Sequence, residues 1–164
     1  MNVFEYAMQM ELDGKAYYEQ AAEKMTSPEL KKIFMEIAGD EQKHYILFKS
    51  MKEGKDVEFV EADATSIFSS AKNIFVSLKE EHKDFDFPED AKKVWEHARD
   101  LEKTAEKYYR DEADKLDDKK TAAIIHKIAD EEHRHWVTME NVINFIDHPN
   151  QWLENAEWAD LDNI

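Results

Sequence analysis

Two Glu-x-x-His pairs are the residues of this sequence best suited to chemistry. Glu41 and His44 lie in the segment IAGDEQKHY, and Glu132 and His135 lie in the similar segment IADEEHRHW. Residues three positions apart on an α-helix share one side, so each carboxylate and imidazole can bind the same metal ion. Chance alone supplies about one such pair in a chain with 22 Glu and seven His among 164 residues, so the pairs by themselves are weak evidence.

A shared spacing makes the pattern specific. The two pairs stand 91 residues apart, and the same offset relates Glu11 in MELDGKAYY to Glu102 in LEKTAEKYY. All four glutamates fall on apolar helical stripes, where an unpaired carboxylate costs on the order of several kcal/mol. Two divalent cations would balance four carboxylates, so the pattern predicts a two-metal site. Oxygen and nitrogen ligands without sulfur favour iron or manganese, and zinc can substitute in the isolated protein.

Apolar residues at three- and four-residue spacing predict the long helices that must position these side chains. The composition agrees, because the chain has only three Gly and three Pro. The predicted helices run from Asn2 to about Met25, from the 26–29 cap to Gly54, from about Glu89 to Lys115, and from Asp117 or Asp118 to His148.

We expect an all-α protein with one domain over residues 1–164. Its parts are a first helix pair at 1–54, a connection with a short helix at 55–88, a second pair at 89–148 and a C-terminal tail at 149–164 with another short helix. The length of 55–88 indicates a long crossover, since a turn between neighbouring antiparallel helices needs far fewer residues.

Charge and composition exclude several classes of function. The net charge of −16 repels nucleic acids and anionic membranes, so neither is an expected partner. The absence of cysteine removes disulfides, thiolate nucleophiles and iron–sulfur ligation. No apolar run approaches the roughly 20 residues that span a bilayer, and the N-terminal segment lacks an apolar signal core. We therefore expect a cytoplasmic protein.

One Glu from each of two helices and one Glu-x-x-His from each of two others is the ligand arrangement of ferritin-like di-iron bundles. On these motifs the sequence resembles the ferritin-like domain of the rubrerythrin family, over nearly the whole chain apart from the C-terminal tail. The resemblance implies a four-helix bundle in which Glu41 and Glu132 bridge two iron ions. It also implies that Tyr18 and Tyr109 hydrogen-bond the iron-binding carboxylates. The implied ligands are Glu11, Glu41, His44, Glu102, Glu132 and His135.

Two departures from that family bear on function. Rubrerythrins usually carry a further glutamate three residues after the third-helix ligand, where this chain has Ala105, and Glu106 points to another side of the helix. The sequence also lacks the cysteine-rich rubredoxin domain, so electrons would come from a separate protein or a small reductant. The leading hypothesis is a di-iron oxidoreductase that acts on O2 or H2O2, assembled as a homodimer or a higher homo-oligomer. The alternatives are an iron-binding, ferroxidase or storage protein, and an inactive helical interaction module.

Several nearby residues have simpler interpretations. Tyr18 and Tyr109 fit core packing as well as a role beside the metals. We expect Glu131 and His133 at the surface, because they lie next to ligands in sequence but on another side of the helix. The remaining histidines form no pattern and are assigned no role.

Overall fold

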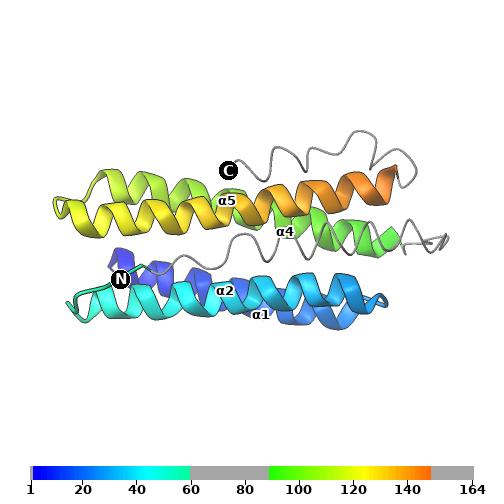
Figure 1. The fold of residues 1–164 in the computed structure, drawn as a ribbon, viewed down its shortest axis with the longest axis horizontal. Coiled ribbons are helices and arrows are strands. Elements are labelled where there is room, and N and C mark those ends of the chain that lie inside the picture. The colour runs from blue at the N-terminus through cyan, green and yellow to red at the C-terminus, as the bar shows by residue number, and fades with distance from the viewer. Residues whose placement is uncertain (1, 60–88, 149–164) are drawn as a thin grey trace.

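The computed structural model describes residues 2–59 and 89–148, which form a bundle of four long helices (Figure 1). The helices are α1 (Val3–Lys24), α2 (Pro28–Lys52), α4 (Glu89–Asp114) and α5 (Lys119–Asp147). The described residues contain no strand, which confirms the predicted all-α class. Residues 60–88 and 149–164 lie outside the described residues, and with them the two short helices that the sequence predicts.

Local sequence signals set the ends of these helices. The Asn2 side chain accepts a hydrogen bond from a first-turn N–H of α1 at 2.8 Å. Ser27 caps α2, whose first residue is Pro28, and Asp118 rather than Asp117 caps α5. Gly54 follows α2 with a φ of 71°, a left-handed conformation that favours glycine. The predicted bounds are therefore confirmed to within a residue or two.

The helices pair as two antiparallel hairpins, α1 with α2 and α4 with α5. The first hairpin lies on the second so that α1 is beside α4 and α2 is beside α5. Figure 1 shows that α2 and α4 run in the same direction. A chain that leaves the end of α2 must therefore travel the length of the bundle before α4 begins, which confirms the predicted long crossover.

Two apolar clusters fill the bundle on either side of a buried polar layer. The first contains Phe34 and Trp95, whose rings stack with centroids 3.8 Å apart. The second contains Phe48 and Tyr109, whose ring centroids are 5.0 Å apart. Along each helix the buried Glu and His residues fall between members of the two clusters. The clusters therefore shield the polar layer from water at both ends of the bundle.

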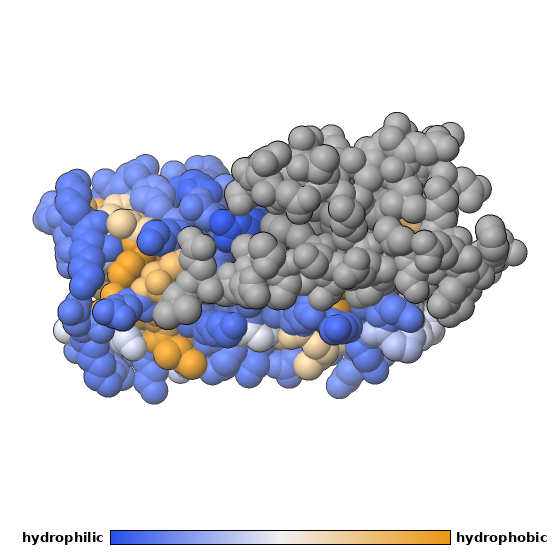
Figure 2. Space-filling model, viewed as in Figure 1, coloured by the Kyte–Doolittle hydropathy of each residue, from blue (hydrophilic) through white to orange (hydrophobic). Residues whose placement is uncertain are grey.

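On the face that Figure 2 shows, most of the described residues are hydrophilic, in keeping with the net charge. In the view of Figure 2, the strongest apolar colour lies towards the end of the bundle where α1 begins and α2 ends. Within the described helices, none combines the length and the apolar character that crossing a membrane requires.

Candidate metal centre

The structure brings all six predicted ligands together in the buried polar layer. Each helix contributes at least one of them, and each of the six residues is at most 4% exposed. They are Glu11 from α1, Glu41 and His44 from α2, Glu102 from α4, and Glu132 and His135 from α5.

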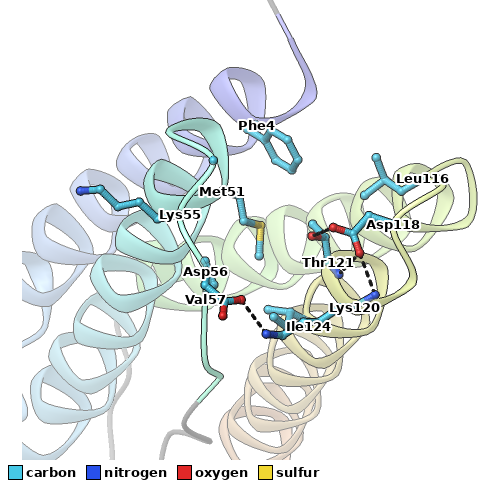
Figure 3. A pocket seen from close by; sticks show the side chains of 11 residues that line it. Phe4, Met51, Lys55, Asp56, Val57, Leu116, Asp118, Lys120, Thr121 and Ile124 are labelled. Atoms are coloured by element: carbon cyan, nitrogen blue, oxygen red, sulfur yellow. Dashed lines mark hydrogen bonds and ion pairs between the residues drawn. The ribbon is translucent and has the colours of Figure 1, made fainter.

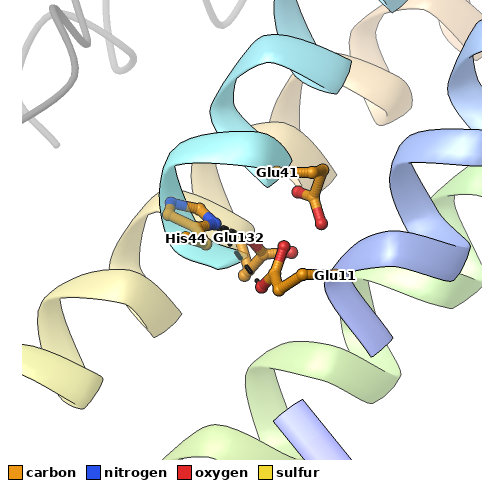
Figure 4. A group of neighbouring side chains, drawn as sticks. All are labelled: Glu11, Glu41, His44 and Glu132. Carbon is orange, nitrogen blue, oxygen red and sulfur yellow. Dashed lines mark ion pairs between the residues drawn. The ribbon is translucent and has the colours of Figure 1, made fainter. Parts of the chain in front are cut away.

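The six residues form two overlapping sets of four. Within each set, the ligand atoms all lie within 4.8 Å of one another. Figure 4 shows the first set converging from α1, α2 and α5. Glu41 and Glu132 belong to both sets, which is the arrangement that two bridging carboxylates require. The sets are Glu11, Glu41, His44 and Glu132, and Glu41, Glu102, Glu132 and His135.

Each of the six residues directs one buried ligand atom at the cluster itself, with no hydrogen bond to a group outside it. His44 Nδ1 lies 2.8 Å from Glu132 Oε1, and His135 Nδ1 lies 3.4 Å from Glu41 Oε1. Four carboxylates in one buried layer repel one another, so the layer needs positive charge. Four carboxylate oxygens and two imidazole nitrogens suit two divalent cations, which would also neutralise the four negative charges. The residues present therefore fit a two-metal centre. The six atoms are Glu11 Oε2, Glu41 Oε1, His44 Nδ1, Glu102 Oε2, Glu132 Oε1 and His135 Nδ1.

A carboxylate behind each imidazole orients the ring. His44 Nε2 lies 3.1 Å from Glu131 Oε1, and His135 Nε2 lies 2.9 Å from Asp40 Oδ2. A proton on Nε2 that is donated to this carboxylate leaves the Nδ1 lone pair directed into the cluster, where a metal would bind. Each contact joins the two hairpins, because the carboxylate and the ring come from different ones.

The prediction that Glu131 is a surface residue is wrong. Glu131 is 5% exposed because the ring of His44 reaches it from the facing helix. Sequence reasoning did not single out Asp40, although the 91-residue offset relates it to Glu131 and each directly precedes a ligand glutamate. His133 remains partly exposed as expected, and its Nδ1 lies 3.0 Å from Glu106 Oε1 outside the cluster.

Tyr18 and Tyr109 each contact a carboxylate of the cluster, as the resemblance implies. Tyr18 donates a hydrogen bond to Glu102 Oε1 at 2.5 Å, and Tyr109 donates one to Glu11 Oε1 at 2.7 Å. Burial, and next the charge of the nearby carboxylate, raises the pKa of each phenol well above 10.0. Both phenols therefore stay protonated and hold the outer oxygens of the two carboxylates.

The metal-free cluster retains protons. Burial raises the pKa of Glu41 and Glu132 well above 4.5, and the neighbouring carboxylates raise it further. Burial alone would lower the pKa of His44 and His135. The negative charge of the facing glutamates outweighs burial and raises both pKa values well above 6.5. These protons must leave when cations bind, so metal binding competes with protonation.

Comparison with known proteins identifies the family. A family model described as the ferritin-like domain matches residues 1–144. The chain belongs to the ferritin-like family. Neither a curated protein nor a solved structure gave a match.

A glycine makes room for one carboxylate of the ferritin-like cluster. Gly14 lies on α1, and a Cβ atom placed on it would be 3.1 Å from Glu41 Oε2 and 3.9 Å from the Tyr18 ring. The 91-residue offset places Ala105 at the corresponding position of the second half. The two halves of the centre are therefore not identical, since only the second carries a methyl group at this point.

A hollow of about 460 Å³ lies at one end of the ferritin-like bundle (Figure 3). Its lining is partly apolar, with Phe4, Met51 and Ile124, and partly charged, with Asp56 and Lys120. The two charged side chains pair with each other at 2.6 Å. None of the six cluster residues lines this hollow, so it does not form part of the candidate metal centre.

Proposed function

We propose that this ferritin-like protein is a rubrerythrin-like di-iron oxidoreductase that reduces O2 or H2O2 with electrons from an external donor. The observation that carries the proposal is the convergence of six buried ligand atoms, four from carboxylates and two from imidazoles, as two overlapping sets. Two iron ions would be held by the four glutamates and the two histidines. When bound, iron would supply the reversible electron transfer that the reduction of an oxidant requires.

The protein residues have separate tasks around the two ions. Glu41 and Glu132 belong to both sets and would hold the ions near each other. His44 and His135 each offer Nδ1, because their Nε2 atoms are engaged by carboxylates. The apolar clusters at both ends exclude bulk water, which strengthens electrostatic interactions inside and limits side reactions.

Tyr18 and Tyr109 fix one oxygen each of Glu102 and Glu11. The other oxygen of each carboxylate is then free to face a cation. A carboxylate can turn so that one or both of its oxygens face a cation. Because each tyrosine holds one oxygen of its glutamate, only the other oxygen would be free to move in this way.

An iron-oxidising protein that serves storage is the second candidate. Ala105 favours it, because the further carboxylate that rubrerythrins usually carry beside the metals is a methyl group here. The net charge of −16 would also attract Fe(II) to the protein surface.

Anaerobic titration with Fe(II) tests the metal centre first. We expect two ions per chain, and fewer than one would refute the di-iron proposal and favour an inactive module. Stopped-flow mixing of the loaded protein with O2 and with H2O2 then shows which oxidant reacts faster. Light scattering separates the two candidates further, because storage requires a closed shell of many subunits and a dimer would contradict it.

A further inference from the structure

Three tyrosine rings connect the candidate metal centre with the protein surface. Tyr109 is hydrogen-bonded to Glu11 at 2.7 Å, and its ring centroid lies 5.9 Å from that of Tyr108. The Tyr108 ring lies 4.9 Å from that of Tyr6, centroid to centroid. Tyr6 is 49% exposed, which makes it one of the few large hydrophobic residues open to solvent among the described residues. The three rings therefore form a continuous path from a buried carboxylate to solvent.

The other half of the bundle contains the corresponding path with one difference. Tyr18 is hydrogen-bonded to Glu102, and its ring centroid lies 5.7 Å from that of Tyr17. The Tyr17 ring lies 4.9 Å from His97, centroid to centroid. The 91-residue offset relates His97 to Tyr6. A phenol can lose one electron together with its proton, whereas an imidazole resists one-electron oxidation more strongly. Only the first path thus ends at the surface in a readily oxidised ring.

We propose that Tyr6 is the residue at which a one-electron reductant delivers electrons to the metal centre, through Tyr108 and Tyr109. This inference rests on the proposed redox function. The donor is a cationic complex or a protein with a basic face, because the chain carries a net charge of −16.

The transfer balances in electrons and protons. Tyr109 passes one electron inward and shares its phenolic proton with Glu11 Oε1 along the existing hydrogen bond. Tyr108 re-reduces Tyr109, and Tyr6 re-reduces Tyr108. The outer two phenols give their protons to water, which both can reach, and take them back when they are reduced. The external donor reduces Tyr6 and is itself oxidised by one electron. Two such transfers supply the two electrons that the reduction of one H2O2 to two water molecules consumes.

Re-reduction kinetics test the path with variants that keep the rings in place. The iron-loaded protein is oxidised with one equivalent of H2O2 and mixed with hexaammineruthenium(II), a cationic one-electron reductant. We expect Tyr108→Phe and Tyr6→Phe to slow re-reduction about tenfold, equivalent to about 1.4 kcal/mol on the barrier. Tyr17→Phe is the matched control and should leave the rate unchanged. Equal rates in the wild type and in Tyr108→Phe would overturn the proposal.

Freeze-quench electron paramagnetic resonance gives a readout that does not depend on turnover. Without reductant, a second equivalent of H2O2 takes up two electrons beyond those that the two Fe(II) ions supplied, and we expect it to leave tyrosyl radicals, identified by a narrower signal when ring-deuterated tyrosine is incorporated. Tyr108→Phe should confine the radical to the buried ring and prolong its lifetime in the presence of the ruthenium complex. An oxidised di-iron centre with no radical, or a radical lifetime that Tyr108→Phe does not change, would refute the path alone. Failure to bind or oxidise two irons would instead refute the proposed function.

Discussion

The substitution Gly14→Ala should stabilise the metal-free protein and weaken metal binding. Alanine is about 0.8–1.0 kcal/mol more favourable than glycine inside a helix, and Gly14 lies within α1. The new Cβ atom would lie 3.1 Å from Glu41 Oε2, a few tenths of an ångström closer than an ordinary contact. Because this oxygen ends a flexible side chain, the carboxylate can move aside at low cost in the absence of metal. We therefore expect a net gain of roughly 0.5–1 kcal/mol in the free energy of unfolding.

A displaced Glu41 carboxylate can no longer serve both sets of ligands equally well. We expect metal affinity to fall by about 10- to 100-fold, the usual effect of disturbing groups that orient metal ligands. Urea titration of the apoprotein measures the first effect, and anaerobic Fe(II) titration measures the second. Gly39→Ala is the matched control, because nothing lies within 4 Å of a Cβ atom there. That variant should gain stability and bind iron normally. Tight iron binding by Gly14→Ala would refute the reasoning.

Three further predictions concern the same cluster. Glu132→Ala should bind fewer than one iron per chain while far-UV circular dichroism stays helical, and loss of helicity would mean that this residue is chiefly structural. Asp40→Asn and Glu131→Gln should each weaken iron binding about 10- to 100-fold, because an amide orients the imidazole less well; unchanged affinity would contradict that role. The metal-free protein should lose stability as pH rises from the usual carboxyl pKa of 4.5 through the usual imidazole pKa of 6.5, because the raised pKa values let the folded state bind more protons than the unfolded one. The pKa values of Asp40 and Glu102 are lowered instead, so these two groups make stability rise with pH, but only below their usual pKa values of 3.8 and 4.5. Thermal melts of the apoprotein check the trend, and a melting temperature that rises with pH over this range would contradict it.

The features that depend on local sequence could be predicted. Helix ends follow from caps such as Asn2 and Asp118, and the inward face of each helix follows from the spacing of apolar residues. The 91-residue offset then predicted which glutamates and histidines would meet. The role of each as a ligand remains a prediction.

The features that depend on how two helices face each other could not be predicted. Glu131 lies on the side of its helix that the sequence predicts, but it is buried because the ring of His44 on the facing helix contacts it. The contact between Tyr6 and Tyr108 depends on the register of α1 against α4. The space beside Gly14 depends on where the Glu41 side chain ends. None of these relations leaves a signal within a single segment.

Every hydrogen bond described for the candidate centre joins one hairpin to the other, from the tyrosine–glutamate pairs to the histidine–carboxylate pairs. Neither hairpin holds a complete ligand set, since each set draws on both. Bound cations would therefore act as a further link between two halves that also meet through the apolar clusters. Ligands that bind only the folded state add about 2.7 kcal/mol at a concentration 100 times the dissociation constant. Metal affinity and the association of the hairpins are therefore coupled, so a change that loosens the contact between the hairpins should also weaken metal binding.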